Sequence, residues 1–132
     1  MLNYEDVAGA IREVLETRLQ IPVQIGAIPP EGGLCVTVGS GTVQRDFAGN
    51  AYVKLRLGIN AKSPGQYEAI HAIHLAHELV IDLRGEADDG SWTINGISVA
   101  STPEVIQTDM MGNYITASTI EVRCVFWKEA NK

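Results

Sequence analysis

The sequence predicts an α+β fold in which two helices pack on a mainly antiparallel β-sheet. Two stretches, residues 3–20 and 63–84, carry apolar side chains at helical spacing. The segments between and after them alternate apolar and polar side chains, as half-solvated strands do. The predicted order is helix, about three strands, helix, about three strands. With 132 residues, the chain is expected to form a single domain over residues 1–132.

The first helix is predicted over residues 3–20. Asn3 can cap its N-terminus, and Glu5 and Asp6 suit the positive end of the helix dipole. Pro22 is expected to stop it. The apolar face recurs at three- and four-residue steps and consists of Tyr4, Val7, Ala8, Ile11, Val14, Leu15 and Leu19.

A strand-rich block is predicted next. In order, we expect a strand over 22–28, a turn over 28–33, a strand over 34–39, a hairpin loop at Gly39–Gly41, a strand over 42–47, a turn at Gly49-Asn50 and a strand over 51–59. In the last strand, Lys54 and Arg56 alternate with apolar residues, so one face is expected in the core. That face consists of Val53, Leu55, Leu57 and Ile59.

The second helix has a clear predicted start. Ser63 suits the N-cap, Pro64 the first helical position, and Gln66 completes a capping box. The helix is expected to run to residues 83–84, where Gly85 can end it.

The last third is predicted to be a polar loop followed by strands. We expect the loop over 86–91, strands over 91–101, 104–110 and 113–127, a hairpin turn at Gly112-Asn113 and a frayed tail over 128–132. The final strand should bury one face, made of Ile120, Val122, Cys124 and Phe126.

Composition narrows the possible functions. Apolar residues make up 45% of the chain, the net charge is −6, and the ten Lys and Arg are scattered along it. The chain therefore lacks the basic stripe of a nucleic-acid binder, although an acidic protein can line a channel that DNA crosses without sticking. No apolar run is long enough to span a bilayer, and the first ten residues do not resemble a secretory signal. The protein is expected to stay where it is made.

All three histidines fall in the second predicted helix. His77-Glu78 starts a zinc-protease motif, but the second histidine of HExxH is missing. His71, His74 and Glu78 lie on one stripe of the helix, whereas His77 falls near the border of the apolar face. The stripe is predicted to face solvent or another subunit. A metal site at His71, His74 and Glu78 is the weaker alternative.

Other chemistry is not indicated. Cys35 and Cys124 form no CxxC pair and are expected to be buried as small apolar side chains. The sequence contains no GxSxG elbow, phosphate-binding loop, GxGxxG motif or EF-hand spacing. We therefore predict no catalytic residues, no cofactor and no enzymatic activity.

Several strands have apolar residues on both faces. Tyr52 lies opposite Val53, and Val125 and Trp127 lie opposite Cys124. A small domain cannot bury both faces of every strand, so part of this surface should meet another subunit. The sequence therefore predicts a homo-oligomer, most simply a ring.

The whole pattern resembles the small tail terminator and minor capsid proteins of long-tailed phages and prophages. The resemblance rests on the leading helix, the strand block, the start KSPGQYEAI of the second helix and the final hairpin PEVIQTDMMGNYITASTIEVRCVF. The matching positions in that hairpin are Pro103, Asp109, Gly112, Tyr114 and 122–126.

The resemblance implies an α+β fold and a hexameric ring at the head-proximal end of the tail tube. Such a ring stops tube polymerisation and joins the tail to the capsid connector. It implies a virion protein that is assembled in the host cytoplasm and does not bind a membrane. Its expected partners are copies of itself, the tail tube and the head connector proteins, and DNA would only pass through the ring. A head–tail completion protein fits the same pattern.

Three loops are expected to reach a neighbour or the tube. They supply the interface candidates Gly39, Ser40, Gly41, Phe47, Asn50, Asp88 and Asp89, to which the last strand adds Trp127. Two alternatives remain open at this point. One is a small ligand-binding module that uses a strand edge or the histidine stripe, and the other is an enzyme whose site forms only between subunits.

Overall fold

The computed structural model describes residues 2–28 and 32–128. The elements in chain order are α1 (Tyr4–Leu19), β1 (Val23–Ile25), β2 (Gly33–Arg45), β3 (Ala51–Ser63), α2 (Gln66–Ile81), β4 (Trp92–Thr108) and β5 (Tyr114–Phe126). The strands form one sheet in the order β1-β2-β3-β5-β4. Only β1 and β2 are parallel, and all other neighbours are antiparallel. The predicted α+β class is confirmed.

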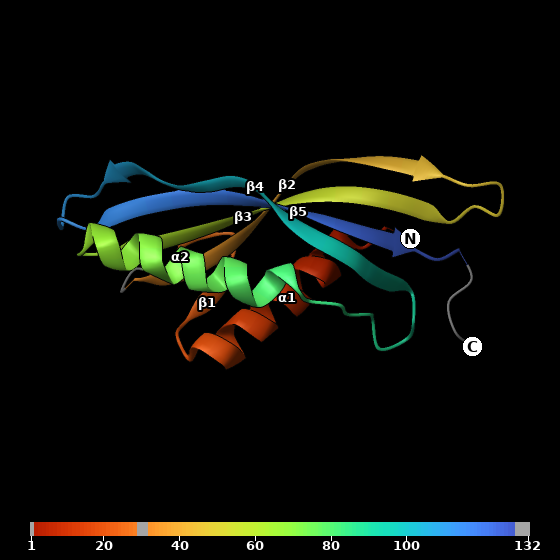
Figure 1. Cartoon of the computed structure of the whole chain (residues 1–132), viewed down its shortest axis with the longest axis horizontal. Helices are drawn as coiled ribbons and strands as arrows, with labels where there is room; N and C mark the ends of the chain where they lie inside the picture. Colours follow the sequence, from red (N-terminus) through yellow and green to blue (C-terminus); the bar gives the residue numbers. More distant parts are fainter. Residues whose placement is uncertain (1, 29–31, 129–132) are drawn as a thin grey trace.

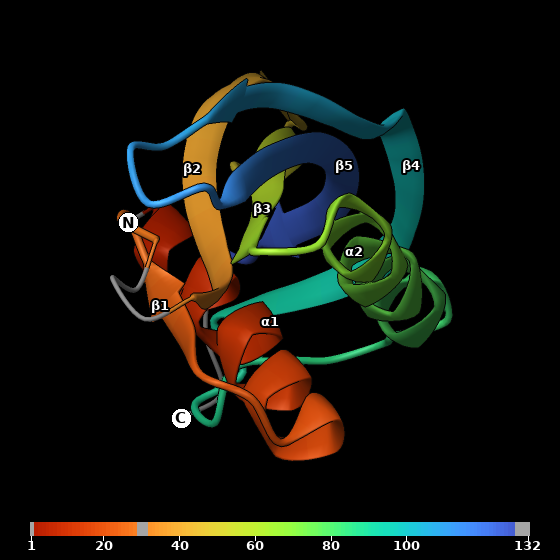
Figure 2. The ribbon, with the colours of Figure 1, turned by 90° about the vertical axis from the view of Figure 1, so that its left-hand side faces the viewer.

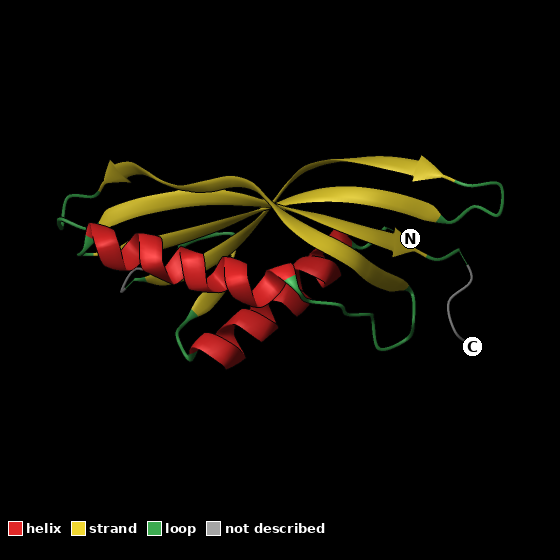
Figure 3. Cartoon of the chain, in the orientation of Figure 1, coloured by secondary structure: helices red, strands yellow, loops and turns green. Residues whose placement is uncertain are grey.

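Both helices lie on the same side of the sheet (Figures 1 and 3). The view along the sheet shows its strong twist, with α1 and α2 side by side beneath it (Figure 2). The predicted alternation in β3 is confirmed, because Leu57 and Ile59 are fully buried while Lys54 and Arg56 are exposed. The core forms between that face and the helices, and its largest fully buried helical side chains are Ile11, Leu15 and Ile73.

Two contacts fix the start of α1. The Asn3 side chain accepts a hydrogen bond from the Asp6 amide at 3.3 Å, so the predicted cap is present. The Asp6 carboxylate in turn accepts the indole N–H of Trp92 at 2.7 Å. Because Trp92 begins β4, this bond ties the first helix to the edge strand farthest from β1 in the sheet.

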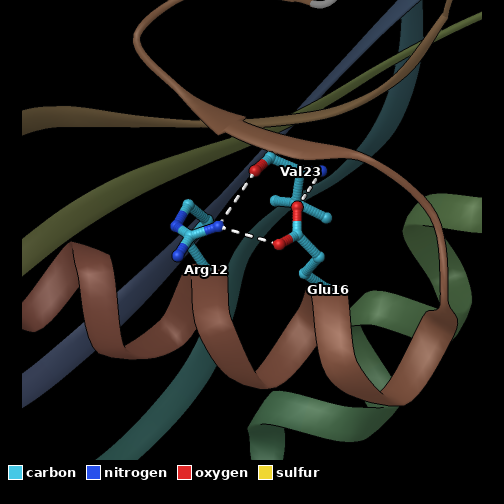
Figure 4. Close-up of polar contacts among 3 residues, drawn as sticks. All are labelled: Arg12, Glu16 and Val23. Carbon is cyan, nitrogen blue, oxygen red and sulfur yellow. Dashed lines mark hydrogen bonds and ion pairs between the residues drawn. The ribbon is translucent and has the colours of Figure 1, made fainter.

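The second half of α1 holds β1 in place (Figure 4). The Glu16 carboxylate accepts the Val23 amide at 3.1 Å, and Arg12 donates to the Val23 carbonyl at 3.4 Å. Arg12 and Glu16 also pair with each other at 3.2 Å. The hydrogen bond from Val23, opposed by partial desolvation and aided by Arg12, lowers the pKa of Glu16. The strand predicted over 22–28 is only three residues long, and Arg12 and Glu16 bind the backbone carbonyl and amide of its first residue, Val23.

The predicted start of the second helix was wrong by two residues. Ser63 is the last residue of β3, where it pairs with Tyr114, and Gly65 takes the cap position without a side-chain bond. The Ser63 hydroxyl instead accepts the Gly65 amide at 3.3 Å. Continued pairing of β3 with β5 therefore outweighs the capping signal. The helix ends at Ile81, before the predicted 83–84.

The hairpin loop predicted at Gly39–Gly41 was also wrong. β2 continues through these glycines, with an irregularity in its pairing to β3 between Val38 and Gly41. A side chain at Gly41 would collide with the carbonyl oxygen of Lys54. Glycine is needed here for a close approach within a bulged strand, not for a chain reversal.

The strands predicted over 91–101 and 104–110 form one strand, β4. Its pairing with β5 shifts at several points. Because β4 is an edge strand, it tolerates Pro103, which has no backbone N–H to donate. The predicted turns at Gly49-Asn50 and Gly112-Asn113 are confirmed. Residues 29–31 of the predicted turn over 28–33 lie outside the described residues, and so do residues 129–132 of the predicted tail over 128–132.

Candidate assembly surfaces

Two hairpin turns are built in the same way, at residues 46–50 and 109–113. Each has the pattern Asp-x-x-Gly-Asn. The Asn50 amides donate to the Asp46 carboxylate at 2.9 and 3.1 Å, and the Asn113 amides donate to Asp109 at 2.8 and 3.1 Å. In both turns the glycine has positive φ. The two turns lie at opposite ends of the molecule's long axis (Figure 1).

Both turns present bare apolar side chains. Phe47 and Met110 are fully exposed, and Met111 is 85% exposed. Hydrogen bonds between Asp and Asn order the backbone of each turn, so little backbone freedom is lost when the apolar side chains are covered. Exposed apolar side chains on ordered turns are typical of contact surfaces.

The carboxylates of the two turns are stabilised as anions. The amide of Asn113, together with Lys62 at 3.0 Å, lowers the pKa of Asp109 to about 2 despite partial desolvation. Partial desolvation opposes ionisation of Asp46, but hydrogen bonds from Asn50 and Tyr52 together lower its pKa. Both turns therefore keep their charge and their shape well below neutral pH.

The structure brings several predicted interface residues to one end of the molecule. The Trp127 amide donates to the Ser91 carbonyl, and the Lys128 amide donates to the Asn50 side chain, both at 2.9 Å. These bonds tie the acidic loop around Asp88 and Asp89 to the end of β5 and to the Phe47 turn. Gly39, Ser40 and Gly41 are exposed too, but on the bulge of β2.

A hollow of about 440 Å³ separates α1 from residues 83–94. Apolar side chains form much of its lining, including Val14, Leu83 and Ile94. Carboxylates lie along the adjoining wall, which is lined by Asp6, Glu13, Glu86 and Asp88. An apolar recess bordered by negative charge suits an apolar side chain with cations beside it.

The uncovered face of the sheet carries three basic side chains, partly offset by Glu121, whose carboxylate lies 3.9 Å from Arg123. Lys54, Arg56 and Arg123 point away from the helices, because their neighbours along β3 and β5 are buried. A second hollow of about 520 Å³ lies here, lined by Tyr52, Lys54 and Arg123 among others. The acidic surplus of the chain therefore lies mainly on the helical side and in the loop over 86–91.

The histidine stripe lies on the exposed side of α2. His71 stacks between Tyr67 and His74 at ring distances of 6.0 and 6.3 Å. His74 contacts Glu78 at 3.1 Å, and both are largely exposed. Within residues 2–28 and 32–128, no three His, Cys, Asp or Glu side chains gather closely enough to hold a metal ion.

His77 is buried, with 7% exposure, and bonds to Ser118 at 2.9 Å. Ser118 spends its only hydroxyl proton on the Ile59 carbonyl at 2.7 Å, so His77 Nε2 must donate to Ser118. A serine in this bond cannot pass its proton to the histidine as a nucleophile would. Burial, and secondarily His74, lowers the pKa of His77. The pair therefore anchors α2 to β5.

Both cysteines are buried and free, as predicted. Burial raises the pKa of Cys35 and raises that of Cys124 to about 11. Neither thiol is therefore a reactive nucleophile at neutral pH.

The exposed pair Met110-Met111 was not among the interface residues predicted from the sequence. Its signal is the repeated Asp-x-x-Gly-Asn, which occurs as DFAGN and again as DMMGN. The repeat identifies two turns of one construction, and the apolar pair inside the second identifies a tip like that of Phe47.

The chain thus has two helices on one face of a twisted, mainly antiparallel sheet, with the two hairpin turns at opposite ends of the molecule. A chain in the virion of a native gene transfer agent particle is similar to it, with a TM-score of 0.52 and 13% sequence identity. The similarity covers 85% of this chain and 84% of that chain. At this identity the likeness establishes a shared fold. No family model and no curated protein sequence matches the chain.

Among the described residues, neither helix is long and apolar enough to cross a membrane.

Proposed function

We propose that this protein is a structural component of a phage-like virion. The observation that carries the proposal is the fold it shares, over most of both chains, with a chain of a gene transfer agent virion. The resemblance of its sequence to phage tail proteins points independently to the same class. Its partners would then be other virion proteins.

More specifically, we propose a ring that caps the tail tube and joins it to the head. Contacts between different patches of identical subunits close into a ring when the rotation allows it. The exposed side chains of Phe47, Met110 and Met111 support such contacts. Apolar side chains are unfavourable in water, and an interface between subunits would bury them. A hexamer is the number that the family resemblance implies.

The charge distribution suggests how such a ring would face DNA. The basic side chains Lys54, Arg56 and Arg123 gather on the uncovered face of the sheet. The helices and the loop over 86–91 carry most carboxylates. A lumen through which DNA slides without sticking would therefore be lined by the helical side.

We also propose that the protein catalyses no reaction. The strongest serine–histidine pair in the described part of the chain, Ser118 and His77, is buried, and its hydroxyl proton is committed to Ile59. The exposed histidines His71 and His74 contact only each other, Tyr67 and Glu78 among the interactions described above.

Deleting the gene in a particle-producing host tests the assignment. Loss of a tail terminator should leave tube polymerisation unchecked, so electron micrographs should show tails longer than normal. Normal-length tails that fail to join filled heads would instead favour the head–tail completion protein. Normal, joined particles would contradict both roles.

The hollow on the basic sheet face favours a second candidate, a module that binds a small anionic ligand. Lys54 and Arg123 would supply the charge there. This candidate predicts a stable monomer in which Lys54→Met weakens binding of small anions in titration calorimetry. A closed oligomer that binds none of them would contradict it.

A further inference from the structure

We propose that Phe47 of one copy inserts into the hollow between α1 and residues 83–94 of a neighbouring copy. The inference rests on the proposed ring and names the two surfaces that would join its subunits.

The donor surface is the turn over 46–50. Phe47 is fully exposed at its tip, and Asn50 holds the turn in shape. Two cations flank it: Arg45 donates to the Gly49 carbonyl at 3.2 Å, and the aliphatic stem of Lys128 lies against Gly49. Asp46 keeps one negative charge in the turn, against the two positive charges of Arg45 and Lys128. The tip is therefore an aromatic ring with a surplus of one positive charge.

The acceptor surface has the complementary character. Its apolar lining includes Val14, Leu83 and Ile94, and its volume of about 440 Å³ exceeds what one phenyl ring requires. Four carboxylates border the hollow and its extension along α1, against two arginines at the opposite end, Arg18 and Arg84. The hollow is thus apolar inside and negative around part of its rim.

A second copy is the occupant that these features select. The chain carries a net charge of −6, so two copies repel unless a local contact offsets the repulsion. The Phe47 turn is a positively charged apolar tip, and the hollow is a negatively charged apolar recess in the same sequence. The Met110-Met111 tip lacks this complementarity, because Lys62 and Asp109 beside it neutralise each other.

The edges of the sheet are weaker candidates for the same contact. β1 pairs with only Leu34–Val36 of β2, and β4 ends the sheet on the other side. However, Pro103 lies within β4, whose pairing with β5 shifts at several points. The part of β2 beyond β1 has an irregularity between Val38 and Gly41. Proline and bulges are devices that discourage pairing at an edge. The tips and the hollow therefore provide the better-defined contact.

Disulfide trapping tests the inference. Chains carrying Ala48→Cys and chains carrying Thr17→Cys, distinguished by different affinity tags, are co-expressed, purified and oxidised. Ala48 is the exposed neighbour of Phe47 in the turn and Thr17 lines the hollow, so Phe47 and the carboxylates of the rim stay in place. The native Cys35 and Cys124 are buried and should not interfere. We expect cross-linked dimers that contain one chain of each kind.

The matched control replaces Ala48→Cys by Met111→Cys, which places a thiol at the equivalent position of the other turn. It should give no mixed dimers with Thr17→Cys. Circular dichroism of each variant before oxidation confirms that the chains are folded.

The outcomes separate the two proposals. An oligomeric wild type whose Ala48 and Thr17 variants give no mixed dimers would overturn this contact and leave the ring standing. Equal trapping by Met111→Cys would overturn it as well, because the contact would then be unspecific. A wild type that remains monomeric would overturn both the ring and the contact.

Discussion

At the scale of single residues, the buried face of α2 is anchored to the sheet by a chain of two hydrogen bonds. His77 donates to Ser118, and Ser118 donates to the Ile59 carbonyl. The helix, β5 and β3 are thereby joined through a group that ordinarily titrates near neutral pH. The sequence placed His77 at the border of the apolar face, but its partner could not be predicted, because Ser118 lies 41 positions away on another element.

The first prediction concerns the pH dependence of stability. Burial lowers the pKa of His77 below 6.5, so the unfolded chain binds this proton more readily than the folded chain. The His77 contribution is therefore fully present above pH 6.5 and is lost as the pH falls through the lower, folded value. Urea unfolding from pH 7.5 to 5.5 should show this loss in the wild type.

The control for this prediction lies on the same helix. His77→Gln should flatten the fall in unfolding free energy over that range, whereas His71→Gln, at an exposed position, should keep it. An unchanged slope in His77→Gln would show that another group is responsible.

The second prediction compares two hydroxyls on one face of β5. Ser118→Ala leaves the buried Ile59 carbonyl without its donor and should lower the unfolding free energy by about 1–3 kcal/mol. Thr116 is equally buried, but its hydroxyl has no hydrogen-bond partner within the part of the chain that the structure describes. Thr116→Val should therefore be neutral or stabilising. Equal destabilisation by both changes, measured by urea unfolding, would contradict this account.

At the scale of elements, the twin turns show what sequence patterns reveal and what they leave out. Gly49-Asn50 and Gly112-Asn113 identified both chain reversals correctly. Gly39-Ser40-Gly41 gave the same signal but lies within a strand, because a glycine also permits the close approach of Gly41 to Lys54. Ser63-Pro64 likewise predicted a helix start that β3 overrides by pairing as far as Ser63. Glycine and Ser-Pro patterns show where regular structure is interrupted. Pairing between distant strands then decides whether the interruption is a turn, a bulge or a helix start.

The third prediction concerns the turn at Asp109. Lys62 lies 3.0 Å from its carboxylate, while the Asn113 amide supplies the larger effect on its pKa. In Lys62→Met the pKa of Asp109 should rise from about 2 but stay below 3.8, since the amide remains. A carboxyl titration followed by NMR measures this. A rise all the way to 3.8 would mean that Lys62 alone sets the pKa.

At the scale of the whole molecule, the alternating strands and amphipathic helices were enough to predict the fold class and the composition of the core. The sequence also identified Phe47 and the acidic loop over 86–91 as surface candidates. It could not show that Trp127 and Lys128 tie these two regions together, because their bonds to Ser91 and Asn50 depend on the register of β5. The hollow beside α1 was equally hidden, since its walls come from segments about 70 positions apart.

These features together describe a small acidic domain whose bare apolar tips and recesses are suited to other protein surfaces. The proposed virion role requires that copies of the chain bind one another. A ring must also close at a defined number of subunits, unlike an aggregate, whose size grows with concentration.

Sedimentation velocity of the purified wild-type chain over a wide concentration series tests this requirement most directly. The account predicts one discrete species above a threshold concentration, with a mass close to that of six chains and no larger polymers. A folded species with the mass of a single chain at every concentration would contradict it.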